Sequence, residues 1–339
     1  MRSSNFELLR IVAMTMIVVH HVIVHGIYPQ LGGAGSSAIL PVIDSLVIYG
    51  VNLFVMISGY FLIKLSWRSY INLMWIIAFY KLFHLCVDTF VLEIGHPWYE
   101  WILKPVSAPV SGGGWFVDIY VLLMLVSPLV NKFLLSVQKN EYFGGLFILL
   151  LLDIGYAHLL KMHFDAYGYS LLHFITLYFI GYGIRHYQNI SRKTAGILLL
   201  GSIALTSILS ILPLRLPIIM SGYNNPLVMV SSCCIFILFA TIKMQPNRIV
   251  NGMAASVFPV YLIHDGGNVG KFFYATIGTW WKEDSLCIFA LQVLLLIVSL
   301  FVMTIAIDQI RKYLAPYIVP PVAEQCEKLS GNVVKKWFT

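Results

Sequence analysis

The first long apolar stretch, residues 6–27, contains an arginine and a histidine whose spacing suggests chemistry. Arg10 and His21 lie eleven residues apart. Because an α-helix turns by about 100° per residue, this spacing puts both side chains on one helical face, about 16 Å apart along the axis. An arginine can hold a phosphate, and a neutral imidazole can take a proton from a hydroxyl near neutral pH. The pair predicts an anion-binding group and a proton-transfer group at different depths of one site.

Neighbouring residues refine this prediction. His20 lies about 100° around the helix from His21, so His21 is the favoured histidine. Glu7 precedes Arg10 by three residues, a spacing at which the two side chains can pair. In a purely structural interpretation, Glu7 and Arg10 extend to the membrane surface while His21 bonds a backbone carbonyl. We favour function, because ionisable groups inside a membrane are costly.

The composition is that of an integral membrane protein. Of the 339 residues, 59% are hydrophobic and 11% are charged, whereas a soluble domain carries roughly a quarter charged residues. We assign the net charge of +7 to cytoplasmic loops rich in Lys and Arg, and expect no nucleic acid partner. The five cysteines have no C-x-x-C spacing, so we expect neither a disulfide nor a metal site.

Apolar windows predict an all-α, polytopic fold with about ten transmembrane helices. The expected spans are residues 6–27, 39–63, 70–92, 115–137, 142–160, 170–187, 194–212, 226–244, 253–275 and 286–310. The ninth is the weakest, because Gly266, Gly267 and Gly270 interrupt it and predict a short or broken helix.

The distribution of positive charge predicts the orientation. With the N-terminus inside, most Lys and Arg side chains fall on the inner side, as the positive-inside rule requires, so both termini should be cytoplasmic. We expect a transmembrane domain over residues 1–312 and a short cytoplasmic tail over 313–339. The expected location is a bacterial-type cell (inner) membrane.

The second span and the residues after it offer further polar candidates. Asn52 and Ser58 lie in a segment whose small residues permit close packing of a helix or of a thin ligand chain, and packing is the favoured interpretation. Lys64 and Arg68 follow directly. Such cations either set the orientation of the chain or bind an anionic cofactor head, and these alternatives stay open.

Two other spans carry ionisable residues. Lys81, His84 and Asp88 share one helical stripe, which predicts either an ion pair bridged by the histidine or a proton path. His264 precedes Asp265 at the end of an apolar run. It either faces a cavity together with His21 or caps a helix, and we slightly favour the cap.

Taken together, these segments resemble acyltransferase family 3, whose integral membrane members move acyl groups, commonly acetyl, onto exported carbohydrates. Arg10 and His21 match the family's Arg-x10-His signature. The segment 50–61 is similar to its G-V-[DN]-L-F-F-x-x-S-G-[FY] motif, with Asn52 where many members have aspartate. Trp115, Tyr120 and Pro128 match W-x4-Y-x7-P, and residues 261–264 match Y-L-I-H.

The resemblance implies a ten-helix acyltransferase that uses acetyl-CoA, or another acyl-CoA, from the cytoplasm and acylates a carbohydrate hydroxyl near the outer face. His21 would be catalytic as a general base, with Arg10 and Glu7 in the same site. The expected cofactor-binding residues are Arg10, Lys64, Arg68, Asn52 and Ser58, and the expected substrate-binding residues are Trp115, Tyr120, Tyr261 and His264. Expected partners are a surface polysaccharide or lipid-linked glycan, membrane lipid and proteins of polysaccharide synthesis.

Two other classes of function are compatible with intramembrane charges. A transporter or flippase for a lipid-linked saccharide would use them to line a substrate path. An inactive scaffold in a polysaccharide-synthesis complex would use them for assembly. Cleavage of the acyl-CoA thioester distinguishes the transferase from both.

Overall fold

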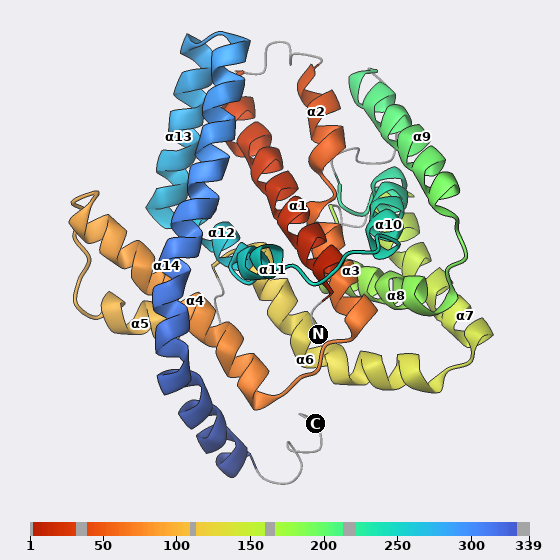
Figure 1. Ribbon diagram of the computed structural model, residues 1–339, viewed down its shortest axis with the longest axis horizontal. Helices are drawn as coiled ribbons and strands as arrows, with labels where there is room; N and C mark the ends of the chain where they lie inside the picture. Colours follow the sequence, from red (N-terminus) through yellow and green to blue (C-terminus); the bar gives the residue numbers. More distant parts are fainter. Residues whose placement is uncertain (1–2, 32–38, 109–112, 160–166, 213–221, 331–339) are drawn as a thin grey trace. The chain divides into compact units, whose positions relative to one another are not determined.

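Figure 1 shows the computed structural model, which describes residues 3–31, 39–108, 113–159, 167–212 and 222–330. These residues form helices and no strand, which confirms the all-α prediction. Six segments are long and apolar enough to cross a membrane, so the chain is a multi-pass membrane protein; they are Ser4–Gln30, Ile39–Phe61, Trp67–Phe90, Trp115–Ser136, Arg192–Ile211 and Leu286–Leu329. The other four expected spans correspond to shorter or interrupted helices.

The chain divides into two compact units. Unit 1 comprises Met1–Val24, Leu31–Ile63 and Leu129–Ala254, and unit 2 comprises His25–Gln30, Lys64–Pro128 and Ala255–Thr339. One helix, α6 (Trp115–Ser136), contributes to both units. Each unit is described below by itself.

Unit 1 is built around α1 (Ser4–His21) and α3 (Gly50–Phe61). The remaining elements of this unit are α2 (Ile39–Val47), α7 (Lys139–Leu150), the π-helical η3 (Leu151–Leu159), α8 (Leu171–Tyr187), α9 (Arg192–Ile211), α10 (Pro226–Ala240) and α11 (Arg248–Ala254). Small residues set the spacing between α3 and α8. A Cβ added at Gly59 or Gly181 would collide with the backbone of the facing helix, so only glycine permits this approach. The packing interpretation of the small residues in the second span is therefore confirmed.

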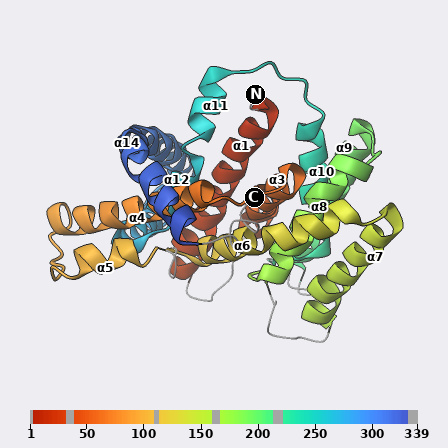
Figure 2. The same ribbon diagram turned by 90° about the horizontal axis from the view of Figure 1, so that it is seen from below.

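Unit 2 is built around α4 (Trp67–Phe90), which packs against α5 (Glu100–Val106), α12 (Val257–His264), α13 (Gly267–Glu283) and α14 (Leu286–Leu329). Figure 2 shows α4 and α5 side by side. The buried carboxylate of Asp308 on α14 accepts hydrogen bonds from Tyr80 of α4 and from Ser256, and it pairs with Arg311 one turn away. These bonds hold the three chain segments together.

The ninth expected span is interrupted, as its glycines predict. It is divided into α11, α12 and α13, and Gly267 at the start of α13 has a φ of 51°, in the left-handed region that favours glycine. The expected domain boundary at residue 312 falls inside α14, which continues to Leu329. The last part of the expected tail, residues 331–339, lies outside the described residues.

Candidate functional site

The predicted anion-binding and catalytic residues lie on one helix, α1. Arg10 Nη1 donates a hydrogen bond to Glu7 Oε1 at 2.6 Å, so the predicted pair is confirmed. The Glu7 side chain is almost enclosed, at 6% exposure, whereas that of Arg10 is 33% exposed. Glu7 therefore anchors one edge of the Arg10 guanidinium group. The arginine side chain stays partly exposed, which it must be to bind a phosphate.

His21 is the last residue of α1 and is buried. The helix continues directly as a π-helical turn, η1 (Val22–Ile27), which begins at the next residue. Such turns are rare and occur often at functional sites. The imidazole rings of His21 and His20 have their centres 5.9 Å apart, so two buried histidines share the end of this helix.

His20 has an acidic partner that the sequence analysis did not identify. Its Nδ1 lies 2.5 Å from Asp44 Oδ1 on α2, and both side chains are buried. An acidic residue within the apolar run 39–63 is the signal that could have revealed this pair, because such residues are rare in membrane spans.

Asn52 on α3 is completely buried and belongs to a polar network inside unit 1. Its Nδ2 donates to the backbone carbonyl of Tyr223 at 3.0 Å and to Ser232 Oγ at 3.3 Å. Its Oδ1 accepts from His173 Nε2 at 3.2 Å. Six residues further along α3, Ser58 Oγ donates to the carbonyl of Phe54. A cofactor role for either residue remains a prediction.

The same network continues to an aspartate. Ser170 caps α8 by accepting from the His173 backbone N–H, which places His173 in the first turn. His173 Nδ1 lies 2.8 Å from Asp153 Oδ2, and both side chains are fully buried. Both ring nitrogens of His173 therefore lie within hydrogen-bond distance of oxygen atoms, one on Asp153 and one on Asn52.

The two cations predicted to bind the cofactor head lie at the surface of unit 2. Lys64 is exposed in the link before α4, and Arg68 is exposed in the first turn of α4. Ser66 and Ser69 form a capping box that fixes this turn. Both cations are therefore held beside a defined helix N-terminus, accessible to a soluble anion.

The predicted substrate-binding residues lie on α6 and α12 in unit 2. Phe116 joins them, because its ring stacks on Tyr120 and meets Tyr261 edge-on, with centres 5.9 and 5.7 Å apart. Trp115 precedes it at the start of α6. His264 ends α12, and its buried Nδ1 lies 2.7 Å from the carbonyl of Val260, which agrees with the favoured helix-capping interpretation.

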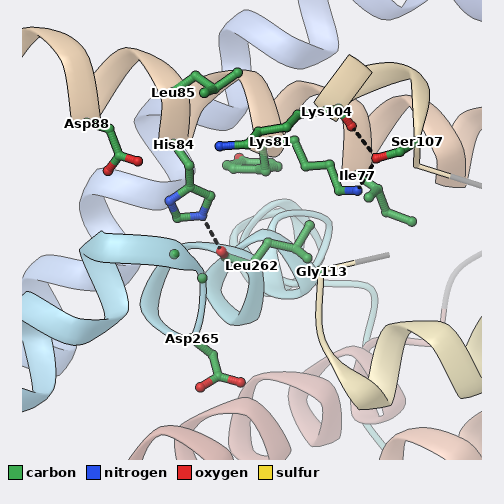
Figure 3. Close-up of a pocket in the computed structure, with 13 residues that line it drawn as sticks. Ile77, Lys81, His84, Leu85, Asp88, Lys104, Ser107, Gly113, Leu262 and Asp265 are labelled. Carbon is green, nitrogen blue, oxygen red and sulfur yellow. Dashed lines mark hydrogen bonds between the residues drawn. The ribbon is translucent and has the colours of Figure 1, made fainter. Parts of the chain in front are cut away.

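A cavity of about 380 Å³ opens beside α12 and α4 in unit 2 (Figure 3). Its lining residues are Ile77, Tyr80, Lys81, His84, Leu85, Asp88, Lys104, Ser107, Gly113, Leu262, Asp265, Gly266 and Gly267. The volume is near the lower end of the range of about 300–1,000 Å³ found for small-molecule sites. A ligand the size of one sugar ring fits this description.

The three ionisable residues of the α4 stripe point toward this cavity, each with a partner on another element (Figure 3). Lys81 Nζ donates to Ser107 Oγ at 3.0 Å, and His84 Nε2 bonds the carbonyl of Leu262 at 2.8 Å. Asp88 Oδ2 accepts from His96 and Asn268. Of the two alternatives for this stripe, the ion pair bridged by the histidine is wrong, because His84 bonds a carbonyl instead of bridging the two charges, and the proton path stays a prediction.

Two buried polar atoms at the cavity wall could still form a hydrogen bond to a ligand. Among the described residues, His84 Nδ1 and Asp88 Oδ1 have no hydrogen-bond partner, although both atoms are buried. Gly266 packs directly on the His84 ring, since a Cβ there would collide with His84 Nε2. The wall thus combines positively charged donors, negatively charged acceptors and apolar side chains. This combination suits a neutral ligand that carries hydroxyl groups.

The predicted site residues are thus divided between the two units. Glu7, Arg10, His21, Asn52 and Ser58 belong to unit 1, and Lys64, Arg68, Trp115, Tyr120, Tyr261 and His264 belong to unit 2. Within unit 1, Glu7 and Arg10 are in direct contact. Within unit 2, the aromatic contacts join Tyr120 to Tyr261 through Phe116.

A family model described as an acyltransferase domain, that of acyltransferase family 3, matches residues 3–308. The match covers every helix from α1 to α13 and the first half of α14. No curated protein and no solved structure matches the chain.

Proposed function

Because the chain belongs to acyltransferase family 3 and is a multi-pass membrane acyltransferase, we propose that it transfers an acyl group from cytoplasmic acyl-CoA to a hydroxyl of an exported carbohydrate. The observation that carries the proposal is the match over residues 3–308, which includes Arg10 and His21 on one helix. Acetyl is the expected acyl group, and succinyl is the alternative. The expected location is a bacterial-type cell membrane.

Arg10 supplies the contact to the donor in this proposal. CoA carries phosphates that do not cross a bilayer, but its pantetheine arm is slim and about as long as the 16 Å between Arg10 and His21 along the helix. The partly exposed guanidinium group, anchored by Glu7, can hold a phosphate while the thioester extends toward His21. Lys64 and Arg68 are exposed cations that provide further phosphate contacts.

His21 acts as the general base. It takes the proton of the acceptor hydroxyl as the oxygen forms a bond to the acyl carbon, and the carbon–sulfur bond breaks with its electron pair on the CoA sulfur. Base catalysis of this kind contributes typically about 10²- to 10⁴-fold in rate. An acyl-histidine intermediate is the less favoured route.

We assign the acceptor to the cavity of unit 2. Its size fits one sugar ring, and its wall offers Lys81 as a donor, Asp88 Oδ1 as an acceptor and apolar side chains for the carbon–hydrogen face of the ring. In the predicted topology, Lys104 is on the outer side and His264 is in the outer half of the membrane. An acceptor delivered from outside would therefore reach this cavity.

The test is release of CoA by the purified full-length protein in lipid nanodiscs, with acetyl-CoA labelled in the acetyl group and a surface-polysaccharide fraction as acceptor. We expect acceptor-dependent CoA release and label in the polysaccharide. We expect His21→Ala to lower kcat by at least about 10²-fold, while His186→Ala, a change at an exposed histidine of α8, has no effect.

The outcomes separate the classes of function. Normal transfer by His21→Ala would exclude both the base and the acyl-histidine routes. Movement of a lipid-linked saccharide without thioester cleavage would support a flippase instead, and neither activity would support a scaffold. Mass spectrometry of surface glycans from cells with and without the protein identifies the acyl group and the acceptor.

A further inference from the structure

Beside the predicted catalytic histidine, α1 carries a second imidazole that is bonded to a carboxylate. His20 Nδ1 and Asp44 Oδ1 lie 2.5 Å apart, and their side chains are only 8% and 10% exposed. A carboxylate accepts a hydrogen bond from the protonated nitrogen of an imidazole, which fixes the tautomer. His20 therefore carries its proton on Nδ1 and presents a lone pair on Nε2.

The second ring nitrogen of His20 is available. Among the described residues, Nε2 has no hydrogen-bond partner, and it is not one of the fully enclosed polar atoms. An imidazole that served only to join α1 to α2 would gain stability by bonding at both nitrogens. Nδ1 of His20 is bonded to Asp44 and Nε2 is available, which is the arrangement expected of a base that a carboxylate holds in position.

Asp44 is held firmly in place. The next residue, Ser45, bonds Ser207 of α9 at 2.6 Å, and the hydroxyl of Tyr49 donates to the Ser45 carbonyl. These bonds fix the last turn of α2 and with it the direction of the carboxylate. The dyad thus sits on packed helices, where small movements of the imidazole are restricted.

Aromatic side chains enclose the dyad. The Tyr223 ring lies 6.1 Å from the His20 ring, and the Tyr169 ring lies 5.5 Å from Tyr223. Tyr169 is 49% exposed, so the far side of this aromatic wall is open.

We propose that His20, oriented by Asp44, is a second proton-carrying residue of the acyl-transfer site and relieves His21 of the proton taken from the acceptor. The inference rests on the proposed function. During transfer, the acceptor O–H proton moves to His21, the carbon–oxygen bond forms and the carbon–sulfur bond breaks. The proton then passes from His21 to His20 Nε2, directly or through one water, and on to the CoA thiolate, which leaves as the thiol.

Every proton and electron pair is accounted for in this sequence. The proton lost by the hydroxyl ends on sulfur, and both histidines return to their neutral state. Asp44 balances the positive charge that His20 carries while it holds the proton, as the orienting carboxylate does in other histidine-based sites. His20 is thus a catalytic residue, and Asp44 is a positioning residue.

The test uses the full-length protein in nanodiscs with the CoA-release assay. We expect His20→Ala to lower kcat by about 10²-fold and to leave both KM values within about twofold. Imidazole added to the buffer should restore part of the lost rate, because it can occupy the vacated space and carry the proton. A structural role for His20 would not respond to free imidazole.

Asp44 is tested by substitutions that keep its size or its charge. We expect Asp44→Asn to lower kcat by about 10-fold or more, since an amide can stabilise the wrong tautomer, and Asp44→Glu to retain more activity than Asp44→Asn. Ser210→Ala on α9 is the control, because it removes a side-chain hydrogen bond to a helix carbonyl in the same unit without altering the groups that hold Asp44.

Three results would overturn the inference. The first is a kcat for His20→Ala within twofold of that of the unaltered protein. The second is a loss of kcat that imidazole does not restore, in a variant that elutes as the unaltered protein does. The third is an equal loss of kcat for Ser210→Ala and Asp44→Asn. Failure of the proposed function is distinguishable, because the unaltered protein would then show no acceptor-dependent CoA release.

Discussion

The polar network of unit 1 and the cavity of unit 2 both contain buried histidine and aspartate side chains, but they differ in whether these side chains border open space. In the network, Asn52, His173 and Asp153 are fully buried, and they bond one another. In the cavity, His84 and Asp88 bond neighbouring segments with one atom and leave another without a partner among the described residues. Only the second arrangement lines the cavity of unit 2, so it has room for a ligand; we call the network the closed region and the cavity the open region.

This difference shows that an ionisable residue inside an apolar helix does not by itself mark a reactive site. The ring of His173 bonds buried side chains at both nitrogens, and these bonds stabilise the packing of α3 and α8 against η3. A histidine or aspartate that borders a cavity and has a polar atom without a hydrogen-bond partner can bind a ligand through that atom. His20 combines the two features, because Asp44 fills one nitrogen and leaves the other accessible.

The largest expected effect tests the closed region. Asp153→Asn replaces the carboxylate that bonds His173 in a fully buried pair, and losing a hydrogen bond to a charged group costs about 1.5–3 kcal/mol of the free energy of unfolding. We expect a large fall in the thermal midpoint of the protein in nanodiscs, with unchanged KM values for the fraction that remains folded. Glu324→Gln, at an exposed position of α14, is the control.

Two outcomes would break the comparison at this point. Unchanged thermal stability of Asp153→Asn would mean that the network is not a stabilising element. A selective rise of one KM without loss of stability would place the network at a substrate, and the distinction between closed and open regions would disappear.

The fold was largely predictable from sequence because its determinants are local. Long apolar runs bounded by charge gave the helices, and the glycines after His264 gave the break between α12 and α13. The pairing of Glu7 with Arg10 was also predictable, since it depends only on spacing within one helix. Interruptions such as the π-helical η1 and η3 were not predicted, because helix periodicity does not reveal one extra residue in a turn.

The parts of the site that join distant segments could not be predicted. Asp44 meets His20 across 24 residues, and Asn52 meets His173 across 121 residues, so the pairing depends on which helices pack together. The stripe of α4 shows the same limit. Its spacing suggested contacts within the helix, whereas packing against α12 gave His84 a carbonyl partner.

A smaller and different effect is expected in the open region. Lys81→Met keeps the apolar stem of the side chain but removes the donor that bonds Ser107 and faces the cavity. If a sugar hydroxyl accepts from this amine, we expect KM for the acceptor to rise by about 10-fold, as loss of a hydrogen bond to a charged group implies. KM for acyl-CoA and the thermal midpoint should change little.

The control for this variant is Lys271→Met, which removes an exposed lysine of α13 that bonds Asn268. Equal effects of both variants on the acceptor KM would show that general surface charge, and not the cavity, attracts the acceptor. A loss of stability without any change in KM would make Lys81 a structural residue like those of the closed network.

The smallest effect is expected at the partly exposed ion pair of Glu100 and Lys104 beside the cavity. At this site water competes for the hydrogen bonds of both charged groups. A hydrogen bond from Lys104 at 2.7 Å, assisted by His96, holds the pKa of Glu100 below its ordinary value. A lowered pKa in the folded state gives stability that is present above the unfolded-state pKa and is lost as the pH falls through the folded-state value. We therefore expect Glu100→Gln to lower the thermal midpoint slightly at pH 7, because solvent screens the pair. The difference from the unaltered protein should shrink as the pH falls below the ordinary pKa of a glutamate and vanish below the folded-state pKa. Thermal midpoints of both proteins across this pH range make the measurement, and a difference that grows on acidification would contradict the assignment of Glu100 as a charged partner of Lys104.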